Sequence, residues 1–306
     1  MNLGYACINT GLSANRIMTN RTMRRKTFDA QGIDYVSDLA LANVKDLKTI
    51  VQWNNEMGIK LFRLSSQIFP WSDEYDITHL KDYNEIAKLM LEVGQIATDG
   101  GQRLTMHPGP YNCLASPTQK VVDKTIRELN FHSEQFNMMG YTPSNYNKIN
   151  IHVGGAYGDK KATLARFCDN FHLLNDDTKK RLVIENDDSP NEYSVKDLFD
   201  GIYQVIGIPI TFDYFHHKFN TGNLTEEEAL KMASITWPEG ITQCCHYSES
   251  RRKEKLDESI RAQAHSDLIS GIIESYGLDI DVVVEAKHKE LAVLNYYKLG
   301  NKLGNK

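Results

Sequence analysis

Histidines and carboxylates recur in this chain where short apolar segments end. Six of them close such segments: His107, His152, Glu185, Asp213, His246 and Glu285. His216 and His265 follow soon after two of these positions. If the segments are parallel strands of one closed barrel, all these side chains converge on a single mouth. A buried carboxylate or imidazole costs several kcal/mol unless it is paired or bound to metal, so the pattern predicts a metal cluster.

The donor set indicates which ions such a cluster would hold. Imidazole and carboxylate ligands without thiolates suit Mn²⁺, Zn²⁺, Fe²⁺ or Mg²⁺, and eight ligands are too many for one ion. We therefore expect two or three ions that share bridging carboxylates. Such a centre would attract a phosphodiester and activate a water by lowering its pKa. The alternative is a network of salt bridges among these side chains without metal. Such a network needs a cation, and only Lys287 lies near enough in sequence to these residues to supply one.

The elements that must position these residues alternate along the chain. Helical spacing of apolar residues spans 36–57 and 80–96, and Gly58, Gly94, Gly140 and Gly207 are expected near helix ends. Short β-rich segments lie between the helical stretches. The predicted strands are 2–8, 59–64, 102–107, 148–153, 181–185, 208–213, 241–246 and 280–285.

This alternation predicts an α/β fold, a single-domain (β/α)8 TIM barrel over residues 1–306 with the metal site at the C-terminal mouth of the strands. A doubly wound open sheet is the structural rival, but no Gly-x-Gly-x-x-Gly follows the first strand. The least regular stretches, 9–33, 108–118, 214–224 and 247–258, each follow a strand. We expect these loops to surround the mouth.

Composition narrows the class of protein. The net charge of −5 argues against a protein that binds nucleic acid through an overall positive charge. Two local clusters of basic residues lie at 21–26 and 251–255, and the simpler interpretation of each is a set of solvated charges in a loop. Five cysteines without C-x-x-C spacing indicate neither a disulfide framework nor a thiolate zinc site. With no leader-like or membrane-length apolar segment, we expect a cytoplasmic, unsecreted protein that does not contact membranes.

Several motifs occur together and in order. They are Leu-Gly-Tyr at 3–5, Leu-Phe-Arg-Leu-Ser-Ser at 61–66, His-Pro-Gly at 107–109, Ile-His-Val-Gly-Gly-Ala-Tyr-Gly at 151–158, Ile-Glu-Asn-Asp-Asp at 184–188, Asp-Tyr-Phe-His-His at 213–217 and Val-Glu-Ala-Lys at 284–287. In these motifs, nearly the whole chain resembles the UV damage endonuclease family, whose fold is related to that of endonuclease IV. The glycine-rich motif and Glu-Asn-Asp are specific in combination, whereas His-Pro-Gly alone is weak.

The resemblance implies a metal-dependent DNA repair enzyme. It implies hydrolysis of the phosphodiester immediately 5′ to UV photoproducts, namely cyclobutane pyrimidine dimers, 6-4 photoproducts and some abasic sites, with up to three Mn²⁺-like ions. The implied ligands are His107, His152, Glu185, Asp213, His216, His246, His265 and Glu285. Glu185 is the best candidate for a bridging ligand, and Glu185 and His246 are expected to be catalytic. Lys287 is placed to contact a phosphate oxygen or the leaving group, and an ion pair with Glu185 or Glu285 is an equal alternative.

The partner implied is damaged double-stranded DNA, bound by a monomer that associates with the nucleoid. Tyr111 matches an aromatic position that probes the damaged pair, and Tyr5 and Asn9 match positions at the damage pocket. A photoproduct weakens stacking, so the lesion turns out of the helix at lower cost and Tyr111 can fill the gap. The simpler alternative packs Tyr111 on the neighbouring prolines. Gly154 and Gly155 permit close approach to DNA, or merely form a tight turn.

Three positions depart from the family pattern. Gln67 stands where several members have a histidine, Pro110 where they have Gln or Asn, and Cys244 where relatives often have lysine. These departures affect the expected metal preference, rate and lesion range. They leave the expected ligand set intact.

Two other functions fit part of the pattern. A metal-dependent sugar isomerase or epimerase uses His, Asp and Glu at the same mouth, but it needs a small polyol pocket and usually two ions. A lesion-binding protein without hydrolysis would use ions only to order its loops. Metal-dependent nicking separates the three, because only the nuclease cuts a strand.

Overall fold

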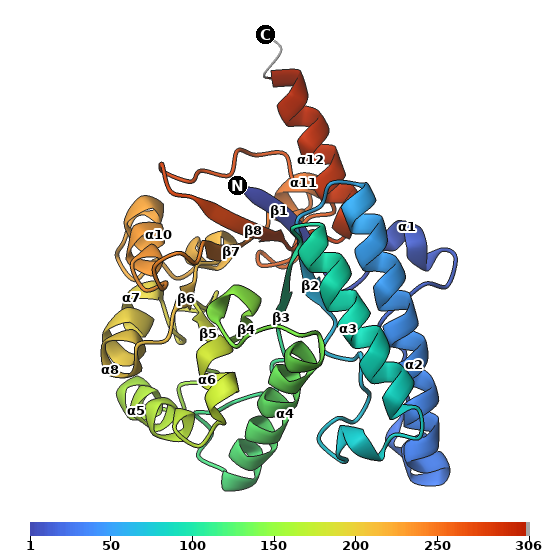
Figure 1. The fold of residues 1–306 in the computed structure, drawn as a ribbon. Coiled ribbons are helices and arrows are strands. Elements are labelled where there is room, and N and C mark those ends of the chain that lie inside the picture. Colours follow the sequence, from blue (N-terminus) through green and yellow to red (C-terminus); the bar gives the residue numbers. More distant parts are fainter. Residues whose placement is uncertain (304–306) are drawn as a thin grey trace.

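Eight parallel strands surround a common axis in the computed structural model, which describes residues 1–303 (Figure 1). The strands are β1 (Asn2–Ala6), β2 (Leu61–Leu64), β3 (Arg103–Met106), β4 (Ile149–Ile151), β5 (Leu182–Glu185), β6 (Ile210–Thr211), β7 (Gln243–Tyr247) and β8 (Ile280–Val284). Their order in the sheet is β6-β5-β4-β3-β2-β1-β8-β7, and every pair is parallel. The predicted barrel is confirmed, and each predicted strand overlaps one of these strands.

The barrel closes between β6 and β7. An isolated parallel bridge joins Asp213 to His246, and the backbone N–H of His246 donates to the carbonyl of Phe212 at 2.9 Å. Two of the predicted ligands therefore lie at the seam itself, where they are held by backbone pairing.

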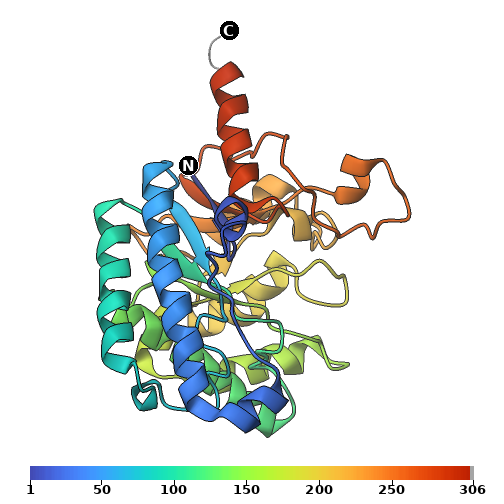
Figure 2. The same cartoon turned by 90° about the vertical axis from the view of Figure 1, so that its right-hand side faces the viewer.

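Helices cover the outside of the barrel (Figures 1 and 2). They are α1 (Thr10–Ser13), α2 (Arg25–Glu56), α3 (Tyr83–Asp99), α4 (Gln119–Met138), α5 (Lys160–Phe171), α6 (Asp176–Arg181), α7 (Val195–Leu198), α8 (Gln204–Ile206), α9 (Tyr214–His217), α10 (Glu226–Ser234), α11 (Arg251–Lys255) and α12 (Lys289–Leu303). Short 3-10 helices η1 (Ile77–His79) and η2 (Asn145–Asn147) and the π-helical segment η3 (Phe199–Tyr203) complete the set.

The apolar faces predicted for the first two long helices are buried. Val44, Leu47 and Ile50 on α2 pack into the core, as Ile86 and Met90 do on α3. The prediction that 9–33 is irregular is wrong in its last part, because α2 begins at Arg25. A break at Gly32, where φ is 65°, and an exposed polar first segment hide the helical period from the sequence.

One glycine prediction is also wrong. Gly58, Gly140 and Gly207 lie just beyond helix ends with positive φ, as expected, but Gly94 lies inside α3. A Cβ on Gly94 would come within 1.9 Å of the carbonyl oxygen of Met139. Glycine is required there because α3 packs directly against the backbone that follows α4.

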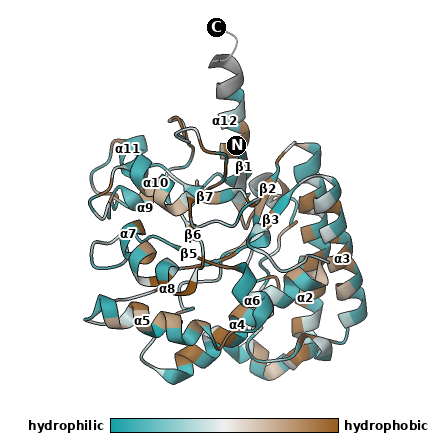
Figure 3. Cartoon of the chain, turned by 60° about the vertical axis from the view of Figure 1, so that its left-hand side comes forward, coloured by the Kyte–Doolittle hydropathy of each residue, from teal (hydrophilic) through white to brown (hydrophobic). Residues whose placement is uncertain are grey.

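Two apolar clusters build the core. The larger lies between the strands and the helices, and the smaller fills the barrel interior with Leu61, Val183, Trp237, Cys244 and Val283 among others. The loop side around α9 and α11 is mostly hydrophilic (Figure 3). Within the described residues, every helix is too short or too polar to cross a bilayer.

Candidate metal centre

Glu185 ends β5 and is only 1% exposed, and four imidazoles surround its carboxylate. Its Oε2 lies 3.2 Å from His107 Nε2 and 3.7 Å from His152 Nε2, and its Oε1 lies 3.0 Å from His246 Nδ1 and 3.5 Å from His216 Nδ1. Two groups result, each able to hold one ion: His107 with Glu185 and His246, and His152 with Glu185 and His216. Both groups contain Glu185, so its carboxylate is common to the two.

Four of the histidines share one arrangement, in which Nδ1 faces an oxygen that can only accept. The pairs are His107 with the Pro108 carbonyl (3.1 Å), His216 with the Asn186 carbonyl (2.8 Å), His265 with the Glu285 carbonyl (2.8 Å) and His152 with Asp187 Oδ1 (2.7 Å). When the ring is neutral, Nδ1 therefore carries the proton, which leaves Nε2 as the atom that can bind a ligand. This is the usual outer-sphere support of metal-binding histidines.

His246 is turned the other way. Its Nδ1 faces Glu185, whereas its Nε2 lies 3.2 Å from the ammonium of Lys148, a fully buried side chain on the segment leading into β4. Lys148 also donates to Thr211 Oγ1 at 2.8 Å and to the carbonyl of Cys244 at 3.2 Å. Burial, reinforced by Lys148, lowers the pKa of His246 to about 3 despite Glu185, so the ring is neutral.

A second unforeseen cation lies at Glu285, which directly follows β8. The carboxylate of Glu285 pairs with the guanidinium of Arg63 on β2. Burial alone would raise the pKa of Glu285, but Arg63 holds it below the usual value. The expectation that only Lys287 supplies a cation is therefore wrong, because Arg63 and Lys148 come from parts of the chain distant in sequence. Lys287 itself is exposed and lines a cavity of about 300 Å³ with Arg63, His265 and Glu285.

Asp213 provides the test of whether a cation fits. Its Oδ1 accepts from the backbone N–H groups of Phe215 and His216, both at 2.7 Å. Its Oδ2 is buried and has no hydrogen-bond partner among the described residues. Burial, with Glu185 and Glu285 nearby, raises the pKa of Asp213 to about 7 against the effect of His216. Leaving a buried carboxylate oxygen unpaired is costly, so this donor set fits a divalent ion.

All eight predicted ligands meet at this mouth. Asp213, His265 and Glu285 flank the two groups: His246 Nδ1 lies 3.4 Å from Glu285 Oε1, and His265 Nδ1 lies 3.7 Å from Glu285 Oε2. Their donors are nitrogen and oxygen, as expected for Mn²⁺, Zn²⁺, Fe²⁺ or Mg²⁺. The thiol of Cys244 is no part of the set, because that residue packs in the barrel interior.

A cleft of about 460 Å³ opens beside the centre, lined by His107, His152, His216 and the two glycines of the motif at 151–158. Gly154 has a φ of +92°, and a Cβ there would lie 3.0 Å from Cys113 Sγ, so this glycine lets two loops pack together. Gly155 faces open space. Tyr111, on the loop after β3, is 87% exposed and therefore does not pack against the neighbouring prolines.

Tyr5 and Asn9 occupy different surroundings from those expected at a damage pocket. Tyr5 is fully buried, and its hydroxyl donates to Asn54 Oδ1 at 2.8 Å and accepts from Asn9 Nδ2 at 3.0 Å. Asn9 Oδ1 also accepts from the backbone N–H of Leu12, which caps α1. Both side chains support packing, and each is at most 1% exposed.

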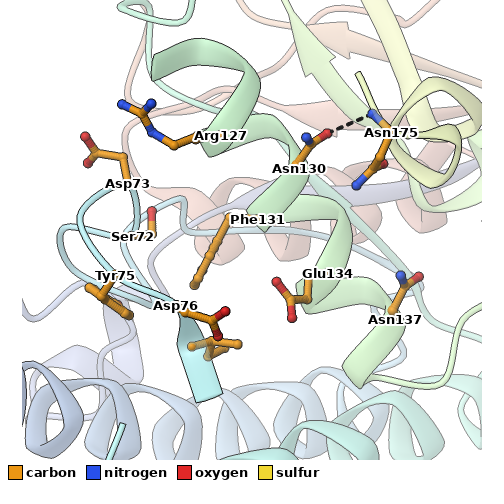
Figure 4. A pocket seen from close by; sticks show the side chains of 11 residues that line it. Ser72, Asp73, Tyr75, Asp76, Arg127, Asn130, Phe131, Glu134, Asn137 and Asn175 are labelled. Atoms are coloured by element: carbon orange, nitrogen blue, oxygen red, sulfur yellow. Dashed lines mark hydrogen bonds between the residues drawn. The ribbon is translucent and has the colours of Figure 1, made fainter. Parts of the chain in front are cut away.

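A second depression, of about 490 Å³, lies on the outer face between residues 72–77 and α4 (Figure 4). Figure 4 shows the carboxylates of Asp76 and Glu134 near each other at the opening and that of Asp73 apart from them. Asp73 pairs with Lys124 at 3.0 Å, and Asp76 accepts from the N–H of Thr78 at 2.9 Å. Its lining contains no histidine, so it lacks the donors of the mouth.

Comparison with known proteins finds relatives of this chain among UV-damage endonucleases. A family model described as UV-endonuclease UvdE matches residues 1–305. The UV-damage endonuclease of Schizosaccharomyces pombe is 38% identical over 313 residues, covering 98% of this chain and 51% of that protein. A putative UV-damage endonuclease of Acanthamoeba polyphaga mimivirus is 32% identical over 311 residues, covering 96% and 90%. The chain thus spans about half the length of the S. pombe relative.

Solved structures agree with the fold. The crystal structure of SacUVDE covers 99% of both chains with a TM-score of 0.85 at 28% identity. D-psicose 3-epimerase from Clostridium cellulolyticum has a TM-score of 0.55 at 13% identity and covers 94% of this chain and 85% of its own. The second likeness is one of fold alone.

Proposed function

The chain belongs to the UV-endonuclease UvdE family, and from that membership we propose that it is a metal-dependent endonuclease that nicks UV-damaged double-stranded DNA. The observation that carries the proposal is the buried carboxylate of Glu185 shared by two groups of imidazoles. The eight residues at the mouth would hold up to three ions, with Mn²⁺ as the first candidate. Bound there, divalent ions lower the pKa of a water and stabilise charge on a phosphate.

The chain's own residues orient this chemistry. The carbonyls of Pro108 and Asn186 and the carboxylate of Asp187 fix the ring orientation of three histidines, so their donors point at one place before substrate arrives. Lys287 is exposed next to Glu285 and can reach a phosphate oxygen or the leaving group. The cleft beside the centre admits a nucleotide turned out of the duplex.

The finer proposal is hydrolysis immediately 5′ to a cyclobutane pyrimidine dimer, a 6-4 photoproduct or an abasic site. Weak stacking at such lesions lowers the cost of opening the duplex there. The exposed ring of Tyr111, at the edge of the cleft, would stack on the bases left behind. The similarity in fold to an epimerase does not indicate that this chain acts on a sugar.

The test is incubation with a duplex that carries one thymine dimer. We expect a single nick on the 5′ side of the dimer in the presence of Mn²⁺, no nick in EDTA, and no nick in an undamaged duplex. A shift in DNA mobility without cleavage would favour a binding protein. Absence of both cleavage and binding with Mn²⁺, Mg²⁺, Zn²⁺ and Fe²⁺ would contradict the proposal.

A further inference from the structure

Two large apolar side chains stand out for their exposure among the described residues. Leu256 is 92% exposed and Tyr111 is 87% exposed. Tyr111 lies on the loop after β3, and Leu256 lies on the loop after β7. In a closed ring with this strand order, β3 and β7 are opposite each other. The two side chains therefore rise from opposite sides of the mouth, with the metal centre between them.

The backbone at Leu256 is unusual for leucine. Leu256 caps the C-terminus of α11 with φ 52° and ψ 40°, which is the left-handed region. Glycine is the usual residue at such a cap because it has no Cβ to clash, and a bulky side chain there is strained. An exposed leucine in a strained position contributes nothing to the core of this protein. Backbone strain of this kind concentrates at functional sites.

The loop that carries Leu256 is anchored at the metal centre. Ser250 and His265 form an antiparallel bridge, and the N–H of Arg251 donates to the carbonyl of Ala264 at 2.8 Å. The two ends of the loop formed by residues 250–265 are therefore paired with each other. His265 is one of the eight residues at the mouth. Figure 2 shows α11 and its flanking chain projecting away from the body of the molecule. The tip is thus held in a fixed relation to the centre.

The opposite arm of the loop borders the cleft. Arg261 is largely exposed, and its Nη2 lies 3.8 Å from Oδ2 of Asp188, a residue that lines the cleft beside the metal centre. A duplex seated over that cleft would meet the loop along its length.

The charge of the loop differs from that of the whole chain. Residues 250–265 contain five basic and three acidic residues, whereas the chain carries a net charge of −5. Lys253 is exposed and lines a groove of about 590 Å³ at the foot of the loop together with Lys218. Basic side chains around an exposed apolar tip are the combination by which proteins hold phosphates while inserting a wedge between base steps.

From this placement we infer that residues 250–265 form a second DNA-contacting element, in which Leu256 wedges into the duplex on the side of the cleft opposite Tyr111. The inference rests on the proposed function, because it needs the mouth to bind a duplex. Lys253 holds a phosphate that flanks the wedge, since the other four basic side chains of the loop pair with carboxylates. Tyr111 and Leu256 contact the duplex from two sides, and the lesion between these contacts faces the metal centre.

The test measures binding of a dimer-containing duplex in a Glu185→Gln background with Mn²⁺, so that the DNA stays intact. Leu256→Ala should weaken affinity about tenfold without changing its dependence on salt, because no charge is removed. Lys253→Ala should lower the salt slope by about one. Ile235→Ala, at an exposed apolar position that caps α10 away from the mouth, is the matched control and should bind like its parent.

A stability measurement separates this role from a structural one. Leu256→Gly should weaken DNA binding as Leu256→Ala does, yet leave the thermal midpoint undiminished, because glycine relieves the strained backbone. Affinity for the duplex equal to that of the parent in both leucine variants would overturn the inference. If the parent also failed to bind the duplex and the wild type failed to nick, the proposed function would fail as well.

Discussion

The cleft at the barrel mouth and the depression in Figure 4 have similar volumes, about 460 Å³ and about 490 Å³. Carboxylates are present in both regions. At the mouth, Glu185 and Asp213 are at most 1% exposed and stand among imidazoles. In the depression, Asp76 and Glu134 are exposed, and Asp73 is already paired with Lys124.

The difference shows that neither cavity size nor the number of acids makes a metal site. Parallel strands bring their C-terminal residues together in one ring. Carboxylates there are buried away from water, so they need imidazoles, cations or metal ions as partners. Acids on an outer face keep their water or pair locally, at little cost. The following experiments test this contrast, from the largest expected effect to the smallest.

Glu185→Gln should reduce nicking by more than about a hundredfold, beyond what loss of an outer-sphere partner causes. The amide keeps the shape of the side chain but loses the charge that both groups of imidazoles share. Cleavage of the dimer-containing duplex and the metal content of the purified protein are the two measurements. Full activity with normal metal content would contradict the role of Glu185.

Asp187→Ala should weaken metal binding about 10- to 100-fold, because the Nδ1 proton of His152 loses its acceptor at 2.7 Å. Calorimetric titration of the metal-free protein with Mn²⁺ measures the change. An affinity equal to that of the wild type would show that the ring of His152 does not need this support.

The stabilisation produced by metal should grow with pH. Without metal, nearby carboxylates outweigh burial and raise the pKa of His152 to about 10 and of His216 to about 9. Such raised pKa values stabilise the metal-free protein below the ordinary histidine pKa, and this stability is lost as pH rises through about 9 to 10. Metal must displace those protons, so its affinity rises with pH. The rise in thermal midpoint on adding Mn²⁺ should be larger at about pH 8 than at about pH 6. Equal rises at the two pH values would contradict the release of protons from these histidines on metal binding.

Tyr111→Ala should lower the preference for damaged over undamaged duplex about tenfold, which is the scale of one lost stacking contact. Metal content should stay the same, because Tyr111 is remote from the ligand atoms. Binding competition between the two duplexes measures the preference, and an unchanged ratio would remove Tyr111 from lesion recognition.

Glu134→Gln, in the depression on the outer face, should change neither nicking nor metal content. Burial and the nearby Asp76 raise the pKa of Glu134, yet its carboxylate has no imidazole beside it. Nicking rates and metal analysis beside the wild type check this. A loss of metal from this variant would erase the contrast between the two regions.

Sequence reasoning located the candidate ligands because six of the eight end predicted strands, and the strand period can be read from apolar residues. It missed Arg63 and Lys148, since a lone cation beside an apolar segment gives no sign of facing the barrel interior. It also missed Asp187, whose role depends on the ring orientation of His152. The resemblance to a family could not predict the surroundings of Tyr5, because they depend on its hydrogen bond to Asn54 on α2.

Short elements were also beyond the sequence. The helix α11 lies within a stretch expected to be irregular, because five charged residues carry no apolar period. The left-handed conformation of Leu256 at its end is invisible without coordinates, since glycine would be the ordinary prediction there.

The most direct measurement is a crystal structure of the protein soaked in Mn²⁺, with anomalous scattering used to locate the ions. The account predicts at least two peaks at the barrel mouth, each about 2.0–2.3 Å from one oxygen of Glu185. Peaks confined to the depression around Glu134, or ions at the mouth that leave Glu185 uncoordinated, would contradict it.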